Sequence, residues 1–258
     1  MLLKGKTALV TGVANDKSIA WAITEALLRE GAKVVLTYQN ERLERRVKSL
    51  AESIDPPLPC VQMDATVAED LERAFGEISG LVDGKLDMLV HSIAYAKKED
   101  LAGGVVDTSA EGFKMAQEIS AFTLLSLTRA ALPLLEAAGG GSVITMTYIG
   151  GERVVPNYNV MGICKASLES SARYLAYDLG PKNIRVNCVS AGPVKTLAAR
   201  GISGFADMYD KIGERTALRR NASLEEVANA ALFLLSPLAG GITGETLYVD
   251  GGYHMMGM

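Results

Sequence analysis

The stretch NYNVMGICKAS, residues 157–167, places Tyr158 seven positions before Lys165. A phenol can donate a hydrogen bond to an oxygen that gains negative charge, and an ammonium stabilises such charge. Seven residues make almost two helical turns, so both side chains would share one helix face, about 10 Å apart along the axis. We therefore predict that Tyr158 points towards a substrate while Lys165 holds a cofactor. The ammonium is also expected to lower the pKa of a neighbouring phenol.

A second phenol, Tyr148, follows a predicted strand at residues 142–147. Open α/β sheets bind their ligands beyond the carboxyl ends of the strands. We therefore expect Tyr148 and Tyr158 to reach one cleft, from a strand end and from a helix start. The alternative is an ordinary amphipathic helix with a packed Tyr158, a solvated Lys165 and a surface Tyr148. Two phenols beside one lysine argue against that alternative.

The elements that position these residues alternate along the chain. Near-continuous apolar runs, typical of strands covered on both faces, predict seven strands at residues 7–11, 33–37, 59–63, 86–91, 142–147, 184–190 and 246–250. Helical patterns lie between them. The alternation predicts one doubly wound α/β domain over residues 1–258, with a seven-stranded parallel sheet and helices on both faces. Residues 193–212 break the rhythm and are predicted to form a substrate-binding lid.

The first strand, turn and helix predict a phosphate-binding cradle. Only Gly12 occupies the turn where G-x-G-x-x-G is usual, and Ser18 opens the helix. A glycine permits close backbone approach, and the N–H groups of a first helical turn attract anions. A plain capped helix after a tight turn explains the same residues, so both interpretations stay open here.

The next strand ends complete a predicted dinucleotide site. Gln39 and Asn40 stand where an acidic residue usually binds the adenosine ribose. Because these amides bind a hydroxyl without attracting a phosphate, NADH is favoured over NADPH as the cofactor. Asp64, after the third strand, either binds the adenine amino group or caps a helix that starts near Thr66. His91 lies within an apolar strand and is predicted to be a core histidine.

Composition narrows the function classes. The chain has 258 residues, is 48% hydrophobic and carries a formal net charge of −4, with no basic block that would suggest nucleic acid as a ligand. No stretch of about 18 apolar residues is expected to span a membrane. Cys60, Cys164 and Cys188 lack metal-ligand spacing, so we expect no metal site and a reducing cytoplasm.

These motifs resemble the short-chain dehydrogenase/reductase superfamily, and within it the bacterial NADH-dependent enoyl-[acyl-carrier-protein] reductases. The resemblance covers essentially the whole chain. Its specific part is Tyr-x6-Lys, because ordinary members of the superfamily carry Tyr-x3-Lys. Ala94 and Tyr95 depart from it, since many relatives have Gly and Phe there. Other matching segments are TYQN at 37–40, HSIAYA at 91–96, RVNCVSAGPVKTLAA at 185–199 and GETLYVDGGY at 244–253.

The resemblance implies a Rossmann-like fold and a reaction. That reaction is the NADH-dependent reduction of the trans-2 double bond of an enoyl-[acyl-carrier-protein], the last reductive step of the bacterial fatty acid elongation cycle. The implied catalytic residues are Tyr158, Lys165 and Tyr148. The implied cofactor contacts are Gly12, Ser18, Ile19, Gln39, Asp64, Ala65, Ile93, Lys165, Val194, Lys195, Thr196, Leu197 and Ala198.

The substrate side and the partners complete the prediction. Ala96 is implied to touch substrate, while Phe205 and Met208 offer apolar surface for an acyl chain beside Tyr148 and Tyr158. Lys195 and Arg200 are expected to help dock an acidic acyl carrier protein. The resemblance also implies a homotetramer.

Two other functions remain to be weighed. A ketoacyl or other carbonyl reductase would need a serine near the end of the fifth strand and a tyrosine four positions before Lys165, where the chain has Met161. A non-catalytic NADH-binding sensor would have no need for two convergent phenols.

Overall fold

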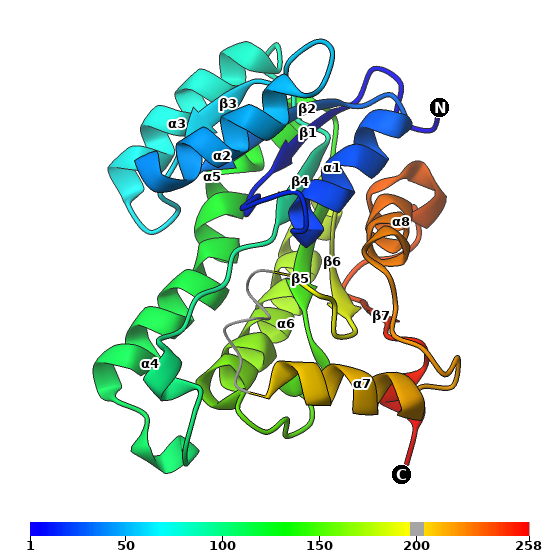
Figure 1. Ribbon diagram of the computed structural model, residues 1–258. Coiled ribbons are helices and arrows are strands. Elements are labelled where there is room, and N and C mark those ends of the chain that lie inside the picture. The colour runs from blue at the N-terminus through cyan, green and yellow to red at the C-terminus, as the bar shows by residue number, and fades with distance from the viewer. Residues whose placement is uncertain (197–203, 258) are drawn as a thin grey trace.

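The computed structural model describes residues 1–196 and 204–257 (Figure 1). Its centre is a parallel seven-stranded sheet with the strand order β3-β2-β1-β4-β5-β6-β7. The predicted number and direction of the strands are thereby confirmed. The strands are β1 Thr7–Val10, β2 Lys33–Tyr38, β3 Cys60–Gln62, β4 Met88–His91, β5 Gly141–Thr147, β6 Ile184–Ala191 and β7 Thr246–Val249.

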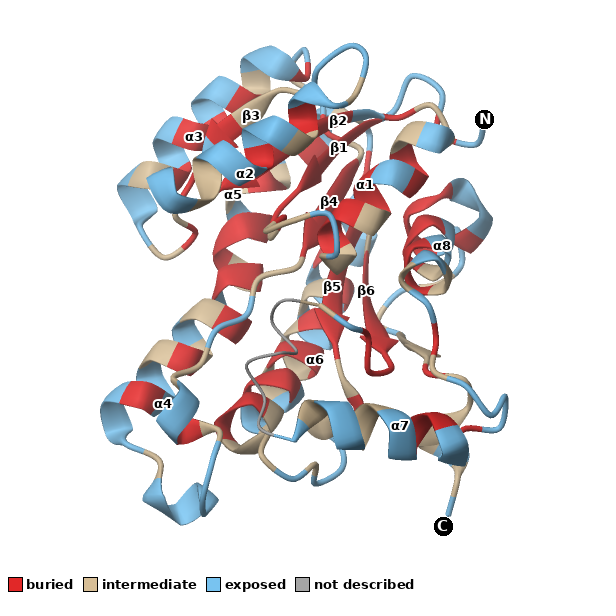
Figure 2. Cartoon of the chain, viewed as in Figure 1, coloured by how far each residue is buried: buried red, intermediate tan, exposed pale blue. Residues whose placement is uncertain are grey.

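Helices cover both faces of the sheet, as predicted, and bury its central strands β1, β4, β5 and β6 (Figure 2). Alternate strand residues face opposite sides, so Ala8 and Val10 of β1 join one core while Leu9 joins the other. Helices α1, α2 and α8 form the first layer, and α3, α5 and α6 form the second. These helices are α1 Ile19–Arg29, α2 Glu41–Glu52, α8 Leu224–Leu235, α3 Ala68–Leu81, α5 Thr123–Ala137 and α6 Asn159–Leu179.

One long helical segment was absent from the predicted elements. Helix α4 (Ala110–Gln117), a π-helical turn (Glu118–Phe122) and α5 run on without a break. Together they make a 28-residue helix long and apolar enough to cross a bilayer, so the expectation that no such stretch exists was wrong. More than half of this segment's apolar window is buried, and α5 packs against β4, α3 and α6. Its hydrophobicity is accounted for by a place in the core.

Helix α1 begins where the sequence predicts, and a glycine follows its end. Ser18 caps α1, because its hydroxyl accepts from the N–H of Trp21. Gly31 follows the last turn of α1 with φ of +85°, the left-handed conformation that glycine adopts without strain. Within the predicted lid, α7 (Phe205–Arg215) follows Gly204 and lies below the carboxyl ends of the central strands in Figure 1.

Candidate active site

The switch point of the sheet lies between β1 and β4, which neighbour each other although two strands separate them in sequence. Doubly wound sheets bind dinucleotides in the crevice beyond such a point. Gly12 follows β1 there with φ of +88°, and a Cβ on it would lie 2.0 Å from the carbonyl oxygen of Ser92. The glycine is therefore required by the approach of two strand-end loops, whereas the sequence suggested an approach to pyrophosphate.

The first turn of α1 fits an anion. Ser18 donates its hydroxyl to the carbonyl of Asn15 at 2.7 Å while it caps Trp21. The N–H groups of a first helical turn have no partner within the helix, and they carry the positive end of the helix dipole. Ile19 begins this turn, so the predicted phosphate-binding residues lie together at the switch point.

A polar cluster ends β2 and β3. Gln39 donates its amide to Asp64 at 2.9 Å, and the same carboxylate accepts from the N–H and the hydroxyl of Thr66. Because α3 starts later, at Ala68, Asp64 closes a local turn and does not cap that helix. Asn40 instead caps α2 through the N–H of Leu43.

Small residues line the crevice next to this cluster. Ala65 is buried, and its carbonyl accepts from the hydroxyl of Ser126 at 3.2 Å. Ile93 is half-buried and packs against the core of the second helix layer. Gln39 and Asp64 thus present an amide and a carboxylate at the ends of β2 and β3, and Ala65 directly follows Asp64 in the sequence.

Two phenols meet beyond the carboxyl end of β5. Tyr148 directly follows the strand, and Tyr158 precedes the first residue of α6. Their rings pack edge to face, with centroids 5.1 Å apart and an interplanar angle of 75°. The hydroxyl of Tyr148 is buried and has no hydrogen-bond partner within the described part of the chain. A buried donor without a partner costs free energy, so a ligand oxygen would be well received there.

The expectation that a lysine lowers the pKa of these phenols was wrong for the protein without ligand. Burial raises the pKa of Tyr148 to about 12 and raises the pKa of Tyr158 further still. The ring of the neighbouring Tyr148 adds to the effect on Tyr158. Both phenols therefore keep their protons at neutral pH, and Tyr158 can serve as a hydrogen-bond donor.

Lys165 lies two turns into α6 and is only 6% exposed. Its ammonium donates to the backbone carbonyl of Met146 in β5 at 2.8 Å. Burial lowers the pKa of Lys165 to about 8, because a charged ammonium is poorly solvated inside the protein. The side chain is thus held against Met146 of β5, one residue before Thr147 and two before Tyr148.

Two side chains near the site that could be reactive, a histidine and a cysteine, have structural roles. His91 is fully buried between the hydroxyls of Thr145 and Thr123, at 2.7 and 2.9 Å, and burial lowers its pKa to about 3. Cys164 is buried, and burial raises the pKa of its thiol to about 11. The prediction of a core histidine is confirmed.

Two glycines allow the turn formed by residues 148–151 to pack closely against α6; this segment is called the Tyr148 turn. A Cβ on Gly150 would lie 2.5 Å from the ring of Tyr158, and one on Gly151 would lie 2.9 Å from a carboxylate oxygen of Glu169. That carboxylate accepts from the hydroxyl of Thr147 at 2.5 Å. Sequence reasoning missed Glu169 and Thr147. The available signal was a glutamate four residues after Lys165, on the same helix face.

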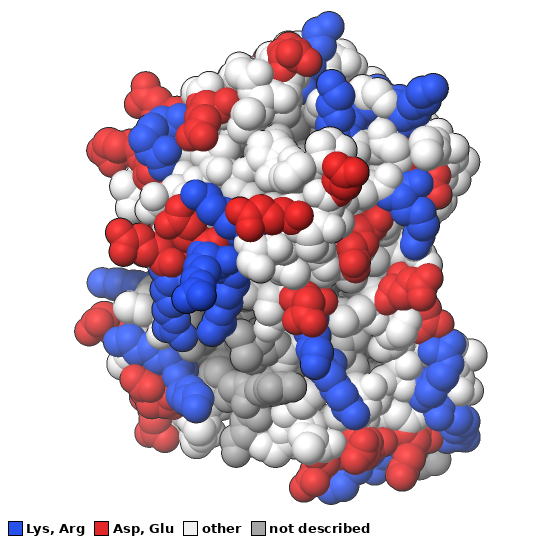
Figure 3. Space-filling view, turned by 45° about the horizontal axis from the view of Figure 1, so that its top comes forward, with Lys and Arg blue, Asp and Glu red and all other residues white. Residues whose placement is uncertain are grey.

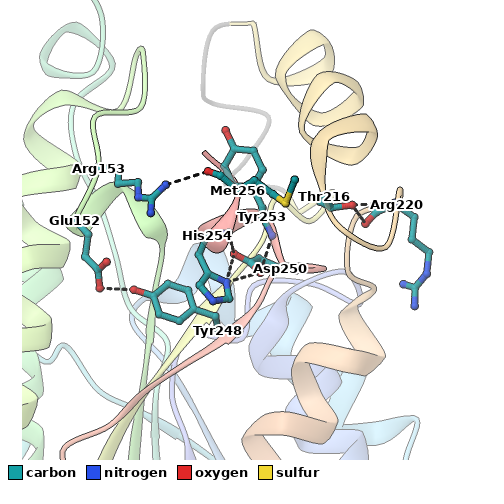
Figure 4. Close-up of polar contacts among 10 residues, drawn as sticks. Glu152, Arg153, Thr216, Arg220, Tyr248, Asp250, Tyr253, His254 and Met256 are labelled. Carbon is teal, nitrogen blue, oxygen red and sulfur yellow. Dashed lines mark hydrogen bonds and ion pairs between the residues drawn. The ribbon is translucent and has the colours of Figure 1, made fainter. Parts of the chain in front are cut away.

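The C-terminal tail braces the same turn (Figure 4). The hydroxyl of Tyr248 donates to Glu152, just after the turn, and the ring of Tyr248 stacks on His254 with centroids 4.1 Å apart. Arg153 donates to the carbonyl of Met256 at 3.5 Å. His254 is held in turn by Asp250. The tail therefore stabilises the segment that carries Tyr148.

The predicted substrate residues lie in two segments of the described chain. Ala96 packs with Tyr158 against a small buried cluster that includes Met161. Phe205 and Met208 are half-buried on α7, so each offers apolar surface.

The segment after β6 contains the last predicted cofactor contacts. Val194 is buried, and its carbonyl accepts from the N–H of Thr196 at 2.8 Å. Lys195 is exposed, with its ammonium 4.4 Å from the ring centroid of Tyr209 in α7. The remaining predicted residues, Leu197, Ala198 and Arg200, lie outside the described part of the chain.

Comparisons with known proteins agree with this geometry. Residues 12–254 match the family described as "Enoyl-(Acyl carrier protein) reductase". The Bacillus cereus protein named enoyl-[acyl-carrier-protein] reductase [NADH] FabI is 50% identical over 260 residues, which cover 99% of each chain. Its counterpart of the same name from Aquifex aeolicus is 48% identical, with 100% of this chain and 94% of the relative covered.

Solved structures give the same result. The Bacillus cereus reductase with NADP+ and indole naphthyridinone superposes with a TM-score of 0.96 at 49% identity, covering 100% of this chain and 99% of the other. The Anaplasma phagocytophilum reductase in complex with NAD superposes with a TM-score of 0.95 at 46% identity, covering 100% of this chain and 97% of the other. Because these matches span nearly the full length at high identity, the chain belongs to the enoyl-[acyl-carrier-protein] reductase family.

Proposed function

We propose that Tyr158, Tyr148 and Lys165 carry out the reaction that family membership assigns to this chain. That reaction is the reduction of the trans-2 double bond of an enoyl-[acyl-carrier-protein] thioester with NADH, in the fatty acid elongation cycle. The observation that carries the proposal is the edge-to-face pair of protonated phenols at the end of β5, with a buried ammonium held against the same strand.

Tyr158 acts as a hydrogen-bond donor to the thioester oxygen. When bound, NADH would supply a hydride to the carbon β to the carbonyl; negative charge would develop on that oxygen, and a proton taken up at the α-carbon would complete the reduction. A raised pKa keeps the Tyr158 proton in place, so the phenol stabilises the developing charge without losing the proton. One such fixed donor is typically worth roughly 3 kcal/mol, or about two orders of magnitude in rate.

Lys165 orients the cofactor. Its carbonyl partner, Met146, lies within β5, so the ammonium is fixed close to the strand ends where a nicotinamide ribose would lie. Below a pH of about 8 the ammonium is charged and can donate to ribose hydroxyls. Tyr148 lines the acyl site, and its unpaired hydroxyl is available to a ligand oxygen.

The cofactor and substrate contacts follow the carboxyl ends of the strands. Gly12, Ser18 and Ile19 border the pyrophosphate, and Gln39, Asp64 and Ala65 border the adenosine. Ile93, Val194, Lys195 and Thr196 border the nicotinamide half, while Leu197 and Ala198, predicted for the same contact, lie outside the described residues. Ala96, Phe205 and Met208 border the acyl chain. Residues 193–212 act as the lid of the single domain, supported by the partial burial of Phe205 and Met208 and by a helix that begins directly after Gly204.

The partners are an acyl carrier protein and further copies of the chain. Charges of both signs are spread over the face in Figure 3, so an acidic carrier would need a local basic contact. Lys195, exposed beside α7, is one candidate. A homotetramer is supported by Tyr174 and Tyr177, which are 72% and 82% exposed on one side of α6. Three free thiols fit a reducing, cytoplasmic location.

One pair of assays tests the proposal. NADH absorbance is followed with a crotonyl thioester and, separately, with an acetoacetyl thioester. We expect oxidation of NADH only with the enoyl substrate. Oxidation only with the ketone substrate would support a carbonyl reductase. No oxidation with either substrate would support a non-catalytic sensor. Tyr158→Phe should lower kcat about a hundredfold while the NADH affinity is retained. Unchanged turnover in this variant would refute the role of Tyr158.

A further inference from the structure

Glu169 is an unusual residue for its position in α6. It is only 6% exposed, although a carboxylate is almost never buried without a partner. Its neighbours Leu168 and Ala172 are buried apolar residues of the core. An apolar side chain would avoid the cost of removing a charge from water, so the carboxylate must be explained by what it contacts.

Its first contact is with the segment that carries Tyr148. The carboxylate accepts from the hydroxyl of Thr147, at 2.5 Å, and Thr147 is the last residue of β5. Gly151 closes the turn after Tyr148 and lies so close that a Cβ there would be 2.9 Å from the same oxygen. Glu169 therefore contacts both ends of the segment from residue 147 to residue 151.

Its second relation is with Lys165. The two residues are four apart in α6, so their side chains lie on the same helix face. Both are 6% exposed. Lys165 donates to a neutral carbonyl, and no ion pair within 4.0 Å joins it to Glu169 in the described chain. The carboxylate thus acts on the ammonium through space, from about one turn away.

The effect of this charge has a definite sign. Burial lowers the pKa of Lys165, and the carboxylate of Glu169 acts in the opposite direction, because it favours the charged ammonium. Burial raises the pKa of Glu169, whereas the Thr147 hydroxyl and Lys165 lower it. Other titratable groups that influence one or both residues are Cys164, Cys188, His91, Glu152, Arg173, Tyr158 and Tyr248.

We propose that Glu169 is a positioning residue, which holds the Tyr148 turn against α6 and keeps a compensating negative charge near the ammonium of Lys165. The inference rests on the proposed role of Lys165 in holding the cofactor. It predicts two separable effects, one through the hydrogen bond to Thr147 and one through the charge.

Two variants separate these effects. Glu169→Gln keeps an oxygen that accepts from Thr147 and removes the charge, whereas Thr147→Val removes the hydroxyl and keeps the charge. Asp178→Asn is the matched control, because it removes a carboxylate from an exposed position of the same helix. NADH affinity is measured by fluorescence titration between about pH 6.5 and 9.5, and melting temperatures verify the fold.

The wild-type protein should lose NADH affinity as the pH rises through the pKa of Lys165. Glu169→Gln should move the midpoint of this loss about one unit to lower pH, as removal of a nearby opposite charge does. Asp178→Asn should leave the midpoint in place. Thr147→Val should also leave it in place, while kcat with a crotonyl thioester falls. Should Glu169→Gln not fold, Glu169→Asp, which retains the charge, must keep the wild-type midpoint.

The outcomes distinguish the inference from the function on which it rests. If Lys165→Met weakens NADH binding but the Glu169→Gln curve coincides with the wild-type curve, Glu169 has no electrostatic role and the inference is overturned. A shifted midpoint in Glu169→Asp would overturn it as well. If Lys165→Met leaves NADH affinity unchanged at every pH, the proposed role of Lys165 itself is refuted.

Discussion

The two ends of the sheet's carboxyl edge differ in how their polar groups are satisfied. At the end formed by β1 to β3, Ser18 is bonded to the backbone of Asn15 and Trp21, and Gln39 and Asp64 are bonded to each other. At the end formed by β5, the Tyr148 hydroxyl is buried without a partner in the described chain. The side chains named at the first end all have partners, so we call it the complete end, whereas the second would gain free energy from a ligand oxygen. A cofactor can thus meet a preformed surface while the substrate side retains an unused donor.

The largest expected effect concerns the complete end. Gly12→Ala would force a Cβ into the carbonyl of Ser92 and strain a positive φ, so we expect a loss of about 3 kcal/mol or more in the free energy of unfolding. Gly5→Ala is the matched control, because Gly5 also has a positive φ but has no atom within 4 Å of the added Cβ. Denaturant unfolding of both variants isolates the Ser92 contact. Equal losses in the two would mean that the close approach is unimportant.

A second test measures how the free energy of unfolding depends on pH through a buried histidine between the two ends. His91, near their boundary, is neutral in the fold with a pKa of about 3, while an unfolded histidine titrates near 6.5. Between these values the unfolded chain binds more protons, so the His91 contribution to stability is lost as pH falls below about 6.5, by roughly 1.4 kcal/mol per unit. His91→Gln should therefore show a shallower fall in stability from pH 7 to about pH 5 than the wild type. Parallel curves would contradict a buried neutral histidine.

The third test acts on the phenol end. Gly150→Ala places a Cβ 2.5 Å from the Tyr158 ring, which must then move from its position against Tyr148. We expect kcat to fall about tenfold with NADH affinity retained, because small misplacements of catalytic groups are costly. Gly80→Ala, at an exposed position of α3 with no atom within 4 Å of the added Cβ, should leave kcat unchanged. A parallel loss of NADH affinity in Gly150→Ala would mean that the two ends are not independent.

The same contrast explains what could be predicted from the sequence. Strands covered on both faces are continuous apolar runs, and Ser18 caps its own helix, so both were readable from local patterns. The contact of Gly12 with Ser92 and the bond between Thr147 and Glu169 join segments far apart in the chain, and they depend on the packed fold. The raised pKa of Tyr158 likewise arises from burial, which no spacing reveals.

The smallest expected effect separates two adjacent amides at the complete end. Gln39 is bonded to Asp64 at the proposed adenosine site, whereas Asn40 caps α2. One hydrogen bond is worth about 1 kcal/mol, so Gln39→Ala should lower the affinity for NADH about fivefold. The kcat and the free energy of unfolding should be retained. Asn40→Ala should instead lower the free energy of unfolding by about 1 kcal/mol and leave NADH affinity in place. Neither amide attracts a phosphate, so both variants should still prefer NADH to NADPH. If Asn40→Ala weakens NADH binding more than Gln39→Ala does, the cofactor is held by the start of α2 and not by the Gln39–Asp64 pair.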